Sequence, residues 1–397
     1  MSVVAPSPRD RQARLATFAI FFVQGLCFAV LLTQVAAIQK KHALSDGELT
    51  IVLLVVPLIA GVGSWLAGAL AARHGSRPVL RAAQAGVCLS VIAVGLAPGL
   101  PALYAATSAF GLAVGAVDAS MNMQAVGVER RYGRAVITGF HAVWSVAAII
   151  GSLWNSQAAA LGLTLTPTFA IAAGAGVVIS LAAGHLLLSR PEERTPETTE
   201  NATPGARVPW RPILPLCLVM AFLYVGDAAI SNFGTVYMDK ILAASPAVLP
   251  LAYAAYQVAM LAARVPGDLA VRRFGPAPVV RLAGAVATLG LAGIVFAPSA
   301  PVAIAAFALT GLGLAVIAPQ TFSAAGRQDP TGTAVARVNI FNYVGFIVGA
   351  AAVGVIADSS TYRLAFAAPL ALAAAIILLA PAFTLRPRTP APQPTHP

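Results

Sequence analysis

Long apolar runs separated by short polar stretches dominate the pattern along this chain of 397 residues. A helix that crosses a bilayer needs about 20 mostly apolar residues, and about twelve runs reach that length. They cover residues 15–38, 48–72, 79–97, 100–126, 135–160, 165–188, 212–238, 247–271, 279–297, 300–325, 334–357 and 362–384. The pattern predicts an all-α membrane protein with about twelve transmembrane helices.

One stretch interrupts the pattern near the middle of the chain. Residues 189–211, SRPEERTPETTENATPGARVPWR, are rich in Pro, Thr and Glu and cannot bury a core, which is typical of a linker. We therefore expect two six-helix halves with short polar ends. The predicted units are an N-terminal tail (1–14), a first half (15–188), the linker (189–211), a second half (212–385) and a C-terminal tail (386–397).

The basic residues predict the orientation. Twenty of the 25 Lys and Arg residues fall in segments on one side of the predicted membrane, and Lys40, Lys41, Lys240 and Arg363 fall on the other. Lys and Arg collect in the cytoplasmic loops of membrane proteins. We therefore expect a multi-pass protein of the inner (plasma) membrane, with both tails, the linker and the basic loops in the cytoplasm. The net charge of +11 is thus a topology signal spread over loops, which argues against a nucleic-acid partner.

An internal repeat supports two homologous halves. RHGSRPVLRAA (73–83) and RFGPAPVVRLA (273–283) share Arg, Gly, Pro, Val, Arg and Ala at a separation of 200, and APGLPALYAATSAFGL (97–112) matches APSAPVAIAAFALTGL (297–312) at the same separation. Halves of six spans with both ends on one side must be parallel repeats. Transporters rock such repeats around a binding site near the middle of the membrane.

These features resemble the Major Facilitator Superfamily (MFS) over essentially the whole chain. The superfamily pattern G-x-x-x-D-R-x-G-R-R between the second and third helices is similar to GALAARHGSR here, with Ala72 at the place of the acidic residue. The second half repeats part of it, again without that acid. The resemblance implies that these residues close the cytoplasmic side: Gly68, Arg73, Gly75, Arg77, Asp268, Arg273 and Gly275.

Within the superfamily, DASMNMQAVGVERRYGR followed by FHAVWS is similar to the fucose-permease-like branch, which includes bacterial inner-membrane members without an assigned substrate. That branch has an acidic residue on the fourth helix with Asn four positions later, which matches Asp118 and Asn122. It also commonly has an acidic residue on the seventh helix, at the place of Asp227. The resemblance carries a transport function with it but no substrate.

Three titratable side chains inside the runs are candidates for proton coupling: Asp118, Asp227 and His141. Carboxyl groups near mid-membrane are costly to ionise and normally face a cavity or an ion path. Neither aspartate recurs in the other half, since Asp118 pairs with Ala318 and Asp227 with Cys27 at the separation of 200, and this favours function over fold. The alternatives are a structural hydrogen bond for each aspartate and simple packing for His141.

Other polar side chains within the runs are candidates for solute binding, with bridging between helices as the alternative. They are Asn122, Gln24, Trp144, Tyr224, Asn232, Gln257, Asn339, Asn342 and Tyr343. Arg264 is the one cation away from the ends of a run, and Asp268 follows it by one helical turn. We interpret these two as an intrahelical pair with a structural or gating role, with solute binding by Arg264 as the alternative.

No Walker-type loop, metal-ligand cluster or nucleophile–base motif stands out, so the sequence predicts no enzyme, no cofactor and no metal. The first hypothesis is a monomeric, proton-coupled transporter that takes up a small polar solute such as a sugar. Proton-driven efflux of a metabolite or drug and a transporter-like receptor or interaction protein remain alternatives. The bilayer, a small solute and protons are the expected partners.

Overall fold

The computed structural model describes residues 6–193, 209–244, 248–249, 251–329 and 331–384. Over these ranges the chain is helical and contains no strand. The helices are α1 (Pro8–Leu32), α2 (Val35–His42), α3 (Asp46–His74), α4 (Ser76–Leu96), α5 (Leu100–Tyr132), α6 (Ile137–Ala160), α7 (Leu165–Gly184), α8 (Arg190–Glu193), α10 (Trp210–Lys240), α11 (Leu251–Phe274), α12 (Pro276–Phe296), α13 (Ala300–Leu314), α14 (Ile317–Gln328), α15 (Thr333–Ser359), α16 (Tyr362–Ala365), α17 (Ala367–Leu379) and the 3₁₀ helix η1 (Ala380–Phe383).

The transmembrane prediction is confirmed in class and closely in number. Within the described ranges, eleven helical segments are long and apolar enough to cross a membrane, with α13 and α14 together forming one of them. The remaining predicted span corresponds to α11, whose 24 residues include two Tyr, a Gln, Arg264 and Asp268. These polar side chains lower its mean hydropathy.

Some predicted boundaries shift. The first helix begins at Pro8, because Ser7 and Asp10 form a reciprocal capping box, and it ends at Leu32 instead of continuing to residue 38. The first residues of the predicted linker form α8, whereas residues 194–208 lie outside the described part of the chain. The predicted C-terminal tail, 386–397, also lies outside it.

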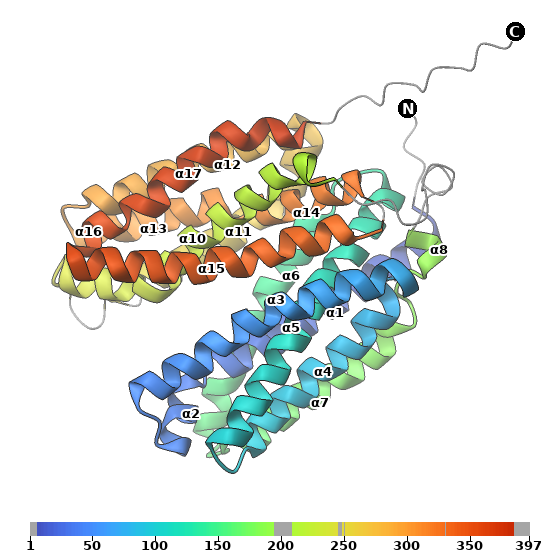
Figure 1. The fold of residues 1–397 in the computed structure, drawn as a ribbon, viewed down its shortest axis with the longest axis horizontal. Helices are drawn as coiled ribbons and strands as arrows, with labels where there is room; N and C mark the ends of the chain where they lie inside the picture. The colour runs from blue at the N-terminus through green and yellow to red at the C-terminus, as the bar shows by residue number, and fades with distance from the viewer. Residues whose placement is uncertain (1–5, 194–208, 245–247, 250, 330, 385–397) are drawn as a thin grey trace, which may run out of the picture.

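The helices form two bundles with the same internal arrangement, as Figure 1 shows from the blue-to-green half and the yellow-to-red half. In the first half, α1 packs on α6, α3 on α5, and α4 on both α5 and α7. In the second, α10 packs on α15, α11 on α13, and α12 on both α13 and α17. The second half therefore repeats the helix pairings of the first half in the same chain order, as parallel repeats require.

Close backbone contacts preserve the separation of 200 residues. A Cβ atom on Gly111 would lie 2.6 Å from the carbonyl oxygen of Val56, and one on Gly311 would lie 2.2 Å from that of Tyr256. Gly75 and Gly275, at the start of equivalent helices, have φ values of +84° and +82°, a region that favours glycine. The internal repeat seen in the sequence is thus a repeat of backbone geometry, and glycines fix the helices of each half tightly together.

The two halves meet at one end. We call this the basic end, because the junction of α3 with α4, the carboxyl ends of α5 and α11, and α8 bring Arg73, Arg130, Arg272 and Arg190 there. Figure 1 shows the two bundles close together near α8 and α14 and diverging toward α2 and α16. Among the described residues, the innermost hydrogen bonds between the halves join Asp118 to Tyr343 and Arg264 to Ser145.

Beyond that level the facing helices do not bond to each other in the described residues. The second part of α6 lines an open hollow of about 520 Å³ in the first half. Ile150, Leu153, Trp154 and Gln157 form its lining. Within the described residues, hydrogen bonds therefore join the halves at the basic end and not at the opposite end.

Candidate functional site

Asp118 connects three helices across the boundary between the halves. Gln24 of α1 donates from Nε2 to Oδ1 of Asp118 over 3.2 Å, and Tyr343 of α15 donates its hydroxyl to Oδ2 over 2.5 Å. The glycines that precede Asp118 on its helix, Gly111 and Gly115, press against the α3 backbone. That packing fixes the rotation of α5, and with it the direction in which the carboxyl group points.

Asn122 and His141 extend this cluster. The side-chain amide of Asn122 donates to the carbonyl oxygen of Asp118 over 2.8 Å, and its Oδ1 lies 3.3 Å from Nε2 of His141. The imidazole lies between Phe21 of the first half and Phe322 of the second, with ring centroids 5.3 and 6.2 Å away. His141 therefore reaches Asp118 only through Asn122.

Asp227 belongs to a separate cluster in the second half. Tyr256 of α11 donates its hydroxyl to Oδ1 of Asp227 over 2.5 Å. Tyr224, one turn before Asp227 on α10, lies within electrostatic range of Asp227, Asp118 and Arg264. Tyr224 is therefore close to both carboxyl clusters.

The predicted pair of Arg264 with Asp268 is wrong. Among the described residues, ion pairs form between Arg9 and Glu192 and between Arg131 and Asp10, and Arg264 makes none. Asp268 instead accepts the backbone N–H groups of Thr138 and Gly139 at the start of α6, each over 2.9 Å. The first N–H groups of a helix have no partner within the helix, and a carboxylate at that end both accepts from them and is stabilised by the helix dipole.

The other predicted solute-binding residues divide between buried or half-buried and exposed side chains. Asn339 is buried and donates to Ser64 Oγ over 3.2 Å, so it bridges the halves. Trp144 packs on Phe28 with ring centroids 5.9 Å apart, and Asn342 is half-buried. Asn232 is exposed and bonds its own helix, and Gln257 is exposed beside Tyr253.

The predicted closing residues also divide. A Cβ on Gly68 would lie 2.6 Å from Cβ of Ala336 in α15, so Gly68 lies at the contact between the halves, as does its repeat partner Asp268. Gly75 and Gly275 shape the junctions after α3 and α11. Arg73 and Arg273 are exposed and Arg77 is half-buried, and none of these three forms an inter-half hydrogen bond within the described residues.

Residues that the sequence analysis did not select complete the closure. Glu129 accepts the backbone N–H groups of Val136 and Ile137, at 2.9 and 3.3 Å, and also the hydroxyl of Ser323 from the other half. Together with Asp268, it satisfies the first N–H groups of α6 with two carboxylates, one from each half. Asp268 was predicted as a closing residue, whereas for Glu129 only its position just after an apolar run could have suggested this role.

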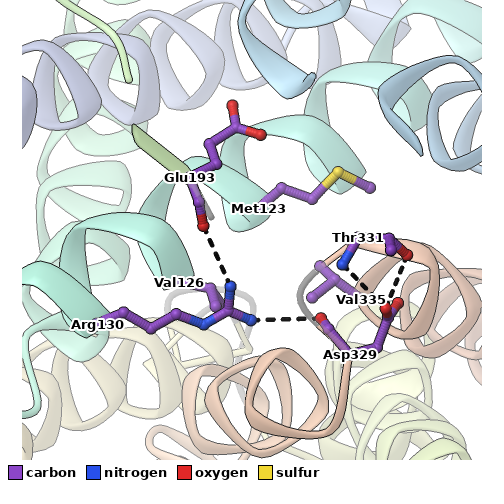
Figure 2. A pocket seen from close by; sticks show the side chains of 8 residues that line it. Met123, Val126, Arg130, Glu193, Asp329, Thr331 and Val335 are labelled. Carbon is purple, nitrogen blue, oxygen red and sulfur yellow. Dashed lines mark hydrogen bonds between the residues drawn. The ribbon is translucent and has the colours of Figure 1, made fainter. Parts of the chain in front are cut away.

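Arg130 forms the outermost part of the closure (Figure 2). Its guanidinium donates to the carbonyl oxygens of Gly326 and Asp329 at the end of α14 and to that of Glu193 in α8. Asp329 in turn accepts from Thr331, over 2.9 Å from N and 2.7 Å from Oγ1. The pocket that they line holds about 10 Å³, roughly the space of one water molecule, so the passage is shut here.

The short helix α8 ties the start of the predicted linker to the first half. Arg9 donates to both carboxylate oxygens of Glu192, over 2.7 and 2.8 Å. These bonds hold the pKa of Glu192 at about 2, well below its usual 4.5. Glu193, the next residue, accepts from the backbone and hydroxyl of Ser76.

Comparisons with known proteins agree with this architecture. A sequence profile of the Major Facilitator Superfamily matches residues 17–225 and 216–396. The uncharacterised transporter y4wD of Sinorhizobium fredii is 30% identical over 363 residues, which cover 91% of this chain and 95% of that protein. An uncharacterised MFS-type transporter of Yersinia pestis is 31% identical over 360 residues, covering 89% and 91%.

Solved structures show the same fold. The chain superimposes on FucP in its outward conformation with a TM-score of 0.77 at 13% identity, over 94% of this chain and 98% of that one. It superimposes equally well on the proton:xylose symporter XylE, with a TM-score of 0.77 at 13% identity, over 94% and 95% of the two chains.

Two parallel helical bundles around a polar centre, closed at one end, define a polytopic membrane transporter and not an enzyme. Both the family profile and the relatives match the chain over nearly its whole length, so the family can be assigned. The chain belongs to the Major Facilitator Superfamily.

Proposed function

We propose that this transporter takes up a small polar solute, such as a sugar, together with protons, by alternating access across the inner membrane. The excess of Lys and Arg at the basic end supports a cytoplasmic location of that end and of both termini. In that orientation the end at which hydrogen bonds join the halves faces the cytoplasm. FucP and XylE, which share the fold, are named as proton symporters of fucose and xylose, which supports the same class of reaction here.

The observation that carries this proposal is the hydrogen bond between Asp118 and Tyr343, which joins the halves at the innermost level of the closure. An ionised carboxylate makes a charge-assisted bond that is roughly twice as strong as a neutral one. Proton uptake by Asp118 would therefore weaken this connection. The proton and the rearrangement of the halves would then be linked through one bond.

The second carboxyl has a different place in the proposal. Asp227 and its partner Tyr256 belong to the same half, so protonation of Asp227 leaves the contact between the halves unchanged at that point. We therefore assign proton coupling to Asp118 and solute binding to Asp227, with Tyr224 between them. His141 is assigned a supporting position, since it reaches the carboxyl cluster through Asn122.

The test is solute-induced proton flux in proteoliposomes, after a screen of sugars and sugar acids has identified a transported solute. Asp118→Asn keeps the size of the side chain and removes its titration. We expect it to abolish proton flux and accumulation while solute exchange continues. Asp227→Asn is the matched comparison, in which solute binding weakens but the remaining uptake still moves protons.

Three results would contradict the proposal. Undiminished proton flux in Asp118→Asn would remove this carboxyl from the coupling mechanism. Solute movement driven outward by an inward proton gradient would instead identify an exporter, and binding without any transport would identify a receptor. Each outcome is read in the same vesicles by reversing the imposed gradient.

A further inference from the structure

Arg264 carries a charge without an anionic partner near the middle of the membrane. Its Nε donates to the carbonyl oxygen of Ala315 over 3.3 Å, and its Nη1 donates to the hydroxyl of Ser145. Both acceptors are neutral, and no carboxylate among the described residues lies within 4.0 Å of its guanidinium nitrogens. An unpaired cation at this depth is costly and is normally retained for a function.

The nearby acids are committed elsewhere. Asp268, one turn further along α11, accepts two backbone N–H groups of α6. Asp227 accepts from Tyr256 through Oδ1, and although it lies within electrostatic range of Arg264, it does not form an ion pair with it. The charge of Arg264 is therefore left for a partner that the described protein residues do not supply.

The geometry of the guanidinium group favours a carboxylate partner. Within the described residues, Nη2 of Arg264 makes no hydrogen bond, and Nη1 makes one bond, to Ser145. The two terminal nitrogens of arginine present parallel N–H groups that match the two oxygens of a carboxylate. A neutral sugar cannot compensate the charge, and a cation would be repelled.

The surroundings indicate what the rest of the solute offers. Tyr224, Tyr256 and Asp227 all lie within electrostatic range of Arg264. Oδ2 of Asp227 makes no hydrogen bond with the described residues and can accept from a hydroxyl or an ammonium group. A complementary solute thus has a carboxylate at one end and hydrogen-bond donors at the other.

We propose that Arg264 binds the carboxylate of the transported solute, which is a small organic acid with hydrogen-bond donors, such as a sugar acid. This inference rests on the proposed uptake function and narrows its substrate class. It also connects binding to movement. The bond from Arg264 to Ser145 crosses between the halves, so a carboxylate that takes Nη1 releases one of the two innermost connections of the closure.

The experiment measures binding by calorimetry to the full-length protein in lipid nanodiscs, with probe pairs that differ in the carboxylate. The pairs are D-glucuronate with D-glucose, D-galacturonate with D-galactose, and L-threonine with L-threoninol. For at least one pair we expect the acid to bind about 10-fold or more tightly than its partner, since a hydrogen bond to a charged group has that effect. Arg264→Gln should reduce the preference to near unity, and Arg264→Lys should keep part of it.

Two further variants serve as controls for the effect of Arg264→Gln. Arg272→Gln removes an exposed arginine of the same helix, which bonds the carbonyl oxygen of Ala135, and should leave the preference unchanged. Ser145→Ala keeps Arg264 and removes its competitor, so it should tighten acid binding even if Arg264→Gln fails to fold. The inference is overturned if none of the acids binds better than its partner, or if Arg264→Gln binds them as the unaltered protein does.

Failure of the inference is distinguishable from failure of the proposed function. Proton-coupled accumulation of a neutral sugar without any binding of acids would overturn the role of Arg264 and leave the uptake proposal intact. Acid binding that depends on Arg264 but leads to no transport would overturn uptake and leave the binding site in place.

Discussion

Asp268→Asn should open the basic end, because the carboxylate of Asp268 holds the start of α6 from the opposite half of the protein. Two N–H groups of α6 donate to it over 2.9 Å each, and the residue is 8% exposed. Asparagine retains one acceptor oxygen and no charge. The closed conformation therefore loses one charge-assisted bond and the attraction of an anion to a helix N-terminus.

The magnitude follows from these losses. A hydrogen bond to a charged group contributes about 1.5–3 kcal/mol, and a charge at a helix end contributes about 0.3–1 kcal/mol. We expect the closed state to lose about 2–4 kcal/mol relative to the state with the basic end open, since Asp268 is hydrated in the latter. That corresponds to a shift of about 30- to 700-fold, which takes a population of about 99:1 to roughly 3:1 or lower.

The assay is a distance distribution between spin labels on His74→Cys and Phe274→Cys, which are exposed repeat partners at the basic end of the two halves. The three native cysteines, Cys27, Cys88 and Cys217, are buried and should react poorly. Asp239→Asn makes the same chemical change at an exposed position and serves as the control. An unchanged distribution in Asp268→Asn, or an equal shift in Asp239→Asn, would refute the reasoning.

Three further predictions test other parts of the structure. Gly63→Ala should lower the melting temperature of the purified protein, because the added Cβ would lie 2.0 Å from the carbonyl oxygen of Leu112. Gly61→Ala on the same helix meets nothing within 4 Å and should be neutral or stabilising. Equal effects of the two substitutions would contradict this packing. The pair of Glu192 with Arg9 should contribute stability above about pH 4.5 that is lost as the pH falls toward 2, because the pKa of Glu192 is about 2 when folded. Comparison of acid unfolding with that of Arg9→Gln checks it, and identical pH profiles would exclude the effect. A reporter inserted at Lys40–Lys41 should be found outside the cytoplasm and one fused after Arg386 inside it, and the reverse result would overturn the orientation.

The features that could be predicted from sequence are those carried by local pattern. Apolar runs predict the spans because a bilayer imposes a fixed length on them, and the repeat at 200 residues appears in both Gly75 with Gly275 and Gly111 with Gly311. Asp118 and Tyr224 could be placed near the centre because position along a helix gives depth. The depth of a residue in the membrane and the helix face on which it lies were sufficient to select candidates for the site.

The partners of these residues could not be predicted, because they come from far along the chain. Asp118 and Tyr343 are separated by 225 residues, and Asp268 and Thr138 by 130. Helical spacing suggested that Asp268 would pair with Arg264. Spacing along one helix carries no information about the N–H groups of a helix in the other half, to which Asp268 bonds instead. Arg130 and Glu129 looked like loop charges for the same reason, although they close the passage.

The long separation between Asp118 and Tyr343 has a consequence for how the protein is made. At a synthesis rate of about 5–20 residues per second, the 225 residues between them take about 10–45 s to emerge. During that time the first half is already in the membrane, with Gln24 as the side-chain partner of the Asp118 carboxyl. The nascent half must tolerate this group without its tyrosine, and a neutral, protonated carboxyl meets that requirement at the lowest cost. The proton that we assign to the transport cycle would thus first be needed during biogenesis, to allow an acidic helix to enter the lipid.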